Sequence, residues 1–152
     1  MSESYTQIHI HIGFSVFGRN NSIEEKHRVE LEKYICGIIN NYKCKPIAIY
    51  CNPDHLHVLI GLSADKSVSE IVRVIKSNSS KYINENNWTF GNFQWQRGYG
   101  AFSYSKSQVD KVVKYILNQK RHHEKESFQE EYVRIMDSMK IEFDRRYLFR
   151  KD

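Results

Sequence analysis

The spacing of apolar residues changes several times along this chain of 152 residues, and the order of the changes limits the folds available to it. Residues 7–17 begin by alternating polar and apolar side chains, which is typical of a strand. Residues 23–42 carry apolar side chains three or four positions apart among charges, which predicts an amphipathic helix. Residues 46–62 alternate again on both sides of a turn at Pro53 and predict a hairpin.

Two helix starts beyond the hairpin share the capping-box pattern. The first begins at Ser67 and predicts a helix to about residue 84, and the second begins at Ser107 and predicts a helix over about 107–121. Between and after these helices we predict a glycine-interrupted strand at 93–104 and a charged helix at about 128–140.

The predicted order of elements is βαββαβ followed by helices, which matches the ferredoxin-like pattern. We therefore expect an α+β fold in which an antiparallel sheet carries helices on one face, with C-terminal helices added. A length of 152 residues favours one domain spanning 1–152, with a core at about 5–104. Such a fold hosts many functions, so the fold alone does not identify the chemistry.

The composition excludes several protein classes. Apolar residues make up 40% and charged residues 27%, which argues against a disordered or fibrous chain. There is no leader sequence and no apolar run near the roughly 18 residues that a membrane span needs, so a soluble, cytoplasmic protein is expected. The net charge of +5 favours a polyanionic partner, and the many tyrosines and phenylalanines are able to stack on bases.

The sharpest local motif is His55-Leu56-His57, directly after the turn. Side chains two positions apart on a strand point to the same face, so the two imidazoles can hold one divalent cation while Leu56 points into the core. The alternative is a pair of unrelated histidines on a sheet surface. The chain has a second such pair at His9 and His11, which we interpret as structural or, at most, as support for the site.

A second candidate group lies on the helix predicted at 107–121. Tyr115 and Gln119 are four residues apart and share one helix face, so a phenol nucleophile and an amide ligand can lie together. The alternative is a surface pair, because a chain with ten tyrosines offers many such spacings.

Four blocks of sequence, taken in order, carry a resemblance to a known family. The blocks are DHLHVLIGL at 54–62, IKSNSSK at 75–81, WQRGYGAFS at 95–103 and YILNQ at 115–119, the last followed by His122 and His123. They resemble the single-tyrosine HUH transposases of small bacterial insertion sequences, the IS-two-hundred-like family. The resemblance extends from about Tyr5 to Phe149.

This resemblance implies a role for each matched residue. His55 and His57 would bind a divalent metal, Mg²⁺ or Mn²⁺, Gln119 would be the third ligand, and Tyr115 would be the nucleophile. The reaction it implies is cleavage and rejoining of single-stranded DNA hairpin ends through a 5′-phosphotyrosine. The family also implies a homodimer in which one subunit's tyrosine helix can complete the partner's site.

The chemistry of these groups leaves two points open. Mixed nitrogen and oxygen ligands suit Mn²⁺, whereas Mg²⁺ prefers more oxygen, and zinc is compatible with the ligand types. A phenol has a pKa near 10 in water, so Tyr115 needs activation by the metal's field or by a base, and the sequence identifies no base.

Contacts to DNA are predicted for basic and aromatic residues in the middle blocks. Lys76, Lys81 and Arg97 are the candidates for phosphate contacts, and the alternative for the two lysines is that they are solvated charges of a helix. Trp95 and Tyr99 are possible stacking platforms, although core packing is the favoured interpretation of both.

Two other functions remain open from the sequence. One is a non-catalytic module that binds RNA on its sheet, although its aromatic reader motif is present only as the fragment Arg97-Gly98-Tyr99. The other is a domesticated HUH endonuclease that no longer moves an element.

Overall fold

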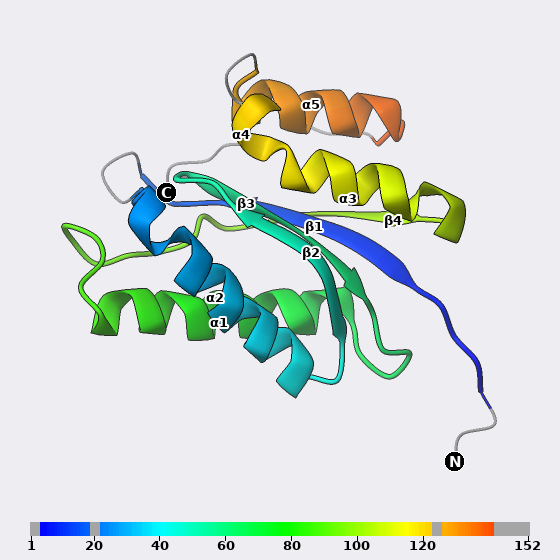
Figure 1. Ribbon diagram of the computed structural model, residues 1–152, viewed down its shortest axis with the longest axis horizontal. Coiled ribbons are helices and arrows are strands. Elements are labelled where there is room, and N and C mark those ends of the chain that lie inside the picture. The colour runs from blue at the N-terminus through cyan, green and yellow to red at the C-terminus, as the bar shows by residue number, and fades with distance from the viewer. Residues whose placement is uncertain (1–3, 19–21, 123–125, 142–152) are drawn as a thin grey trace.

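A four-stranded antiparallel sheet in the order β2-β3-β1-β4 organises the fold (Figure 1). The computed structural model describes residues 4–18, 22–122 and 126–141. The strands are β1 (His9–Ser15), β2 (Lys45–Cys51), β3 (His55–Gly61) and β4 (Gly100–Tyr104). The helices are α1 (Arg28–Asn41), α2 (Val68–Glu85), α3 (Val109–Leu117), α4 (Gln119–His122) and α5 (Phe128–Ser138), with 3₁₀ turns η2 (Glu25–His27) and η3 (Lys106–Gln108). The predicted ferredoxin-like βαββαβ arrangement is confirmed.

Helices cover both faces of the sheet, and α1 and α2 lie on the opposite face from α3 and α5 (Figure 1). The alternation along β3 assigns its side chains to these layers. Leu56, Val58 and Ile60 join the main core with α1 and α2, whereas Leu59 packs with Val112 of α3. Six of the seven β3 residues are buried for this reason. His55 and His57 therefore point into the layer formed by the C-terminal helices.

The helix predicted at 107–121 is divided. The α3 helix ends at Leu117, and the backbone N–H of Asn118 donates to the carbonyls of Lys114 and Tyr115. Asparagine competes with the helix for backbone hydrogen bonds, which accounts for a break at this position. The α4 turn then begins at Gln119, so Tyr115 and Gln119 do not share one continuous helix.

Serine N-caps precede α2, η3 and α5. Only half of the box predicted at Ser67 forms, because the Ser67 hydroxyl accepts from the backbone N–H of Glu70 at 3.1 Å, whereas the Glu70 carboxylate accepts from that hydroxyl. The box predicted at Ser107 is wrong by two residues, since Ser105 and Gln108 form it instead. An unpredicted box at Ser127 opens α5.

The strand predicted at 93–104 forms only over Gly100–Tyr104 in β4. Upstream, Trp95 makes a single bridge to Val16, and Gly98 has a positive φ of 86° that interrupts regular pairing. The Lys76 ammonium donates to the carbonyls of Gln96 and Gly98, at 2.8 and 2.7 Å, and fixes this irregular segment. Over the described residues, none of the helices has the length and apolar character that a membrane crossing requires.

Candidate active site

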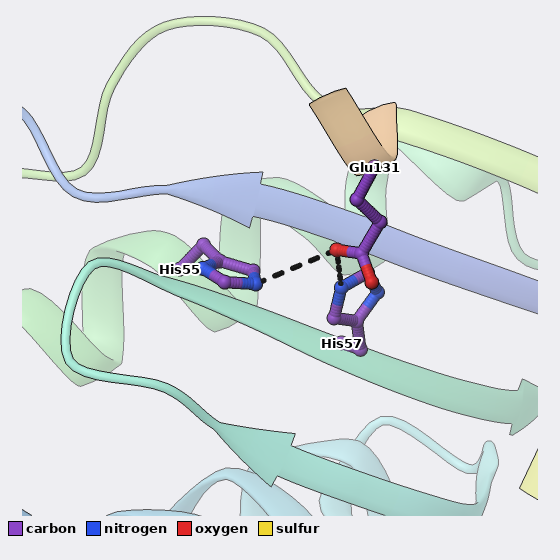
Figure 2. A group of neighbouring side chains, drawn as sticks. All are labelled: His55, His57 and Glu131. Carbon is purple, nitrogen blue, oxygen red and sulfur yellow. Dashed lines mark hydrogen bonds and ion pairs between the residues drawn. The ribbon is translucent and has the colours of Figure 1, made fainter. Parts of the chain in front are cut away.

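The two histidines of the His-x-His motif lie side by side on β3, as predicted. Both are buried, and their ring centroids are 5.2 Å apart. Figure 2 shows the two rings presenting nitrogen atoms to the carboxylate of Glu131, which descends from α5. The Nε2 atom of His57 is 2.7 Å from Glu131 Oε1, and the Nε2 atom of His55 is 3.6 Å from the same oxygen.

The other nitrogen of each ring is held by a separate partner. Asp54 Oδ1 lies 2.7 Å from Nδ1 of His55, and His11 Nε2 lies 2.8 Å from Nδ1 of His57. Burial, together with the proximity of His57, lowers the pKa of His11 to about 3, so His11 stays neutral. Without a metal, the Nε2 atom of His57 donates to Glu131; with a metal in place, a proton on each Nδ1 would leave the lone pair of each Nε2 for the cation. His11 thus supports the site from β1.

Glu131 is the residue that the sequence reasoning missed. Its side chain is buried, and it shares the inner face of α5 with Phe128 and Ile135. The ring of Phe128 stacks on His55 at 4.1 Å between centroids, which holds α5 over the histidines. An acid at helical spacing among buried apolar residues was the available signal, because a lone carboxylate is not buried there without partners.

The charge of Glu131 is retained despite burial. Burial alone would raise the pKa of this carboxyl, but hydrogen bonds from His55 and His57 outweigh it and lower the pKa to about 2. Hydrogen bonds from His55 to the carboxylates of Asp54 and Glu131 likewise overcome burial and raise the pKa of His55. The centre of the site is therefore an ionised carboxylate surrounded by imidazoles.

Tyr115 reaches the same carboxylate from α3. Its phenol hydroxyl donates to Glu131 Oε2, and its ring lies 5.9 Å from that of His57, edge to face. Arg134 of α5 also donates to the phenol oxygen, from Nη2 at 3.1 Å. The predicted nucleophile and the His55–His57 pair thus meet within one chain.

Gln119 lies beside the cluster and is fully buried. Its amide nitrogen is 3.3 Å from Glu131 Oε2 and 3.3 Å from the carbonyl oxygen of Tyr115. Its amide oxygen accepts from Asn52 Nδ2 at 3.2 Å. Rotation of the amide by 180° exchanges the two atoms, so the side chain is able to turn its oxygen toward a cation.

The arrangement fits a divalent cation. Ligand atoms of His55, His57 and Glu131 all lie within 4.8 Å of one another, and all three residues are buried. Two imidazole nitrogens and a carboxylate oxygen form a donor set that suits Mn²⁺, Fe²⁺ and Zn²⁺ and tolerates Mg²⁺ less well. With Glu131 included, the donor set is anionic rather than the neutral set expected from His55, His57 and Gln119.

The predicted DNA contacts lie outside this cluster. Lys76 is half-buried and bonded to the 94–98 segment. Lys81 is exposed on α2, where its Nζ atom lies 3.9 Å from Glu85 Oε1. Arg97 is exposed on that segment. Trp95 is a core residue whose indole N–H donates to Ser79, as the favoured interpretation expected, while Tyr99 remains 40% exposed.

The solved structures that share this fold include two transposases. One is a candidate transposase from Deinococcus radiodurans, with 17% identity and a TM-score of 0.59 over 78% of this chain and 95% of that one. The other is a REP-associated tyrosine transposase bound to a REP hairpin, with 18% identity and a TM-score of 0.60 over 81% of this chain and 74% of that one. A search of curated proteins gave no match.

The family comparison covers more than half of the chain. A family model described as "Transposase IS200 like" matches residues 4–119, a span that includes all four strands, α3 and the positions of His55, His57 and Tyr115. The α5 helix follows this span. The chain therefore belongs to the IS200-like transposase family.

Proposed function

We propose that this transposase cleaves and rejoins single-stranded DNA ends through a covalent 5′-phosphotyrosine on Tyr115. One observation carries the proposal: the Tyr115 hydroxyl meets the buried His55–His57–Glu131 cluster, although its helix and β3 are far apart in the sequence. A tyrosine that served only packing would not need its hydroxyl at a cluster able to hold a cation.

The covalent step conserves the phosphodiester bond energy. The Tyr115 oxygen would attack phosphorus, and the bond between phosphorus and the upstream 3′-oxygen would break. The phenol proton would pass to Glu131, its hydrogen-bond acceptor, and the leaving 3′-oxygen would take up a proton from water. Attack on the phosphotyrosine by another 3′-hydroxyl would reverse these changes and join the strands without ATP.

The proposed cation site consists of His55, His57 and Glu131, with the Gln119 amide beside it. A bound Mn²⁺ or Mg²⁺ would supply positive charge to the scissile phosphate. Asp54 and His11 would orient the two imidazoles through their Nδ1 atoms.

We propose hairpin-forming single strands as the substrate. The family assignment supports a DNA partner, and one protein with the same fold is bound to a REP hairpin. The net charge of +5 also suits a polyanion. Lys76, Lys81 and Arg97 remain the proposed phosphate contacts. A homodimer is expected from the resemblance, although Tyr115 already meets the site of its own chain.

The test is covalent capture. The protein is incubated with Mn²⁺ and single-stranded oligonucleotides copied from the DNA that flanks its gene, and adducts that survive denaturing electrophoresis are scored. We expect an adduct with the wild type and none with Tyr115→Phe, while the control Tyr104→Phe keeps the adduct. A non-catalytic binding module would give no adduct with any of the three proteins, although all would retard the oligonucleotide on a native gel.

A further inference from the structure

The α5 helix contributes two charged residues to the phenol oxygen of Tyr115. Glu131 accepts the hydroxyl proton, and Arg134, one helical turn later, donates to the oxygen. Both residues follow the 4–119 segment that matches the family. Of the two, only Arg134 brings a positive charge to the attacking atom.

The guanidinium of Arg134 is held in a defined orientation. Its Nε atom donates to both carboxylate oxygens of Glu126, at 3.3 and 3.1 Å, and its Nη2 atom donates to Glu126 Oε1 at 3.1 Å. Nη2 also donates to Tyr115 Oη at 3.1 Å, and the guanidinium carbon lies 5.7 Å from the centroid of the Tyr115 ring. Glu126 therefore fixes the plane of the Arg134 guanidinium, and Tyr115 accepts one of the N–H donors that remain on that guanidinium.

The third nitrogen of this group is available to a ligand. Within the described part of the chain, Nη1 of Arg134 makes no hydrogen bond, although a guanidinium nitrogen of this type carries two N–H donors. The Arg134 side chain is 50% exposed, whereas His57 and Glu131 beneath Tyr115 are buried. The two N–H donors of Nη1 thus belong to a solvent-exposed guanidinium next to the Tyr115 oxygen.

The charge pattern favours a phosphate at this position. Arginine keeps its charge at any pH that a protein tolerates, and Nη1 has two N–H donors to offer to a phosphate oxygen. Tyr115 becomes more negative as it gives up its proton, and a cation in contact with its oxygen stabilises that change. The hydrogen bond between Arg134 and Tyr115 therefore strengthens as the phenol proton leaves.

We propose that Arg134 is a catalytic residue, which stabilises the Tyr115 oxygen through Nη2 and binds a non-bridging oxygen of the scissile phosphate through Nη1. The inference rests on the proposed function. Arg134 transfers no proton and forms no covalent bond, so the bonds made and broken are those of the Tyr115 reaction.

The test compares single-turnover rates of adduct formation at saturating oligonucleotide and Mn²⁺. Arg134→Ala should lower the rate about 10- to 150-fold, the range that corresponds to loss of a charge-assisted hydrogen bond. Added guanidinium ion at millimolar concentration should restore part of that rate. Glu126→Ala keeps the charge of Arg134 and loses only the ion pair that orients it, so its rate should fall less than that of Arg134→Ala. Lys33→Gln, on α1 across the sheet, controls for the loss of one positive charge.

Each outcome decides the inference. Equal losses in Arg134→Ala and Glu126→Ala, with no rescue by guanidinium, would show that the ion pair only holds α5, and would overturn the catalytic role. An Arg134→Ala rate equal to that of the wild type would overturn it as well. Absence of any Tyr115 adduct in the wild type would overturn the proposed function together with this inference, so the two failures are distinguishable.

Discussion

Replacing Glu131 with glutamine removes one buried charge while preserving the shape of the side chain. The interactions that lower the pKa of this carboxyl from 4.5 to about 2 stabilise its ionised form. At about 1.4 kcal/mol for each pKa unit, Glu131→Gln should lower the unfolding free energy of the metal-free protein by about 3 kcal/mol at pH 7. The adjacent Glu130→Gln is the control, because glutamine also serves in a capping box and Glu130 is exposed.

The sign of the pH dependence follows from the lowered pKa. A group whose folded pKa is depressed stabilises the protein above its unfolded pKa, and that contribution is lost as the pH falls through the folded value. The difference between wild type and Glu131→Gln should thus stay near 3 kcal/mol down to about pH 5 and decline to about half by pH 3. Urea unfolding in EDTA, monitored by the fluorescence of the buried Trp88 and Trp95, measures this difference in unfolding free energy. A difference that is absent, or constant from pH 7 to pH 3, would refute the reasoning.

Three further variants test other contacts. His11→Ala removes the partner of His57 Nδ1 and should weaken Mn²⁺ binding about 10- to 100-fold by calorimetry; unchanged affinity would contradict the orienting role. Gly100→Ala places a Cβ 2.6 Å from the Tyr132 ring and should cost about 1–3 kcal/mol of stability, and an unaltered thermal midpoint would argue against this packing. Lys76→Met removes two donors to backbone carbonyls and should destabilise by about 1–3 kcal/mol in urea; a wild-type midpoint would exclude a structural contribution.

The order of strands and helices was predictable because the spacing of apolar residues that distinguishes them is a local property of the sequence. The strand at β1, the hairpin of β2 and β3, and the helices α1 and α2 follow from alternation and helical spacing alone. Element ends were harder to predict, since they depend on contacts between distant residues. The strand expected from 93 begins only at Gly100, after Gly98 with its positive φ, and Lys76 on α2 binds the carbonyls of Gln96 and Gly98.

The site was predictable where residues share an element. His55 and His57 needed only the two-residue period of a strand, and Leu56 points into the opposite core as expected. The sequence could not show that α5 folds back over β3, because no local pattern encodes that packing. Glu131 has the helical spacing of the apolar residues Phe128 and Ile135, which was a signal for its burial, whereas Arg134 resembles any other charge of this helix. Their positions at the site became visible only from their contacts with His57 and Tyr115.

Peptide mapping of the covalent product tests the role of Tyr115 most directly. The adduct formed with Mn²⁺ and a single-stranded end is digested with nuclease and protease, and the modified peptide is sequenced by mass spectrometry. We predict a nucleotide remnant on Tyr115 and an equal amount of DNA product with a free 3′-hydroxyl. A remnant on Tyr104 or Tyr132, or cleavage that leaves a free 5′-phosphate and no modified peptide, would contradict the assignment of Tyr115 as nucleophile.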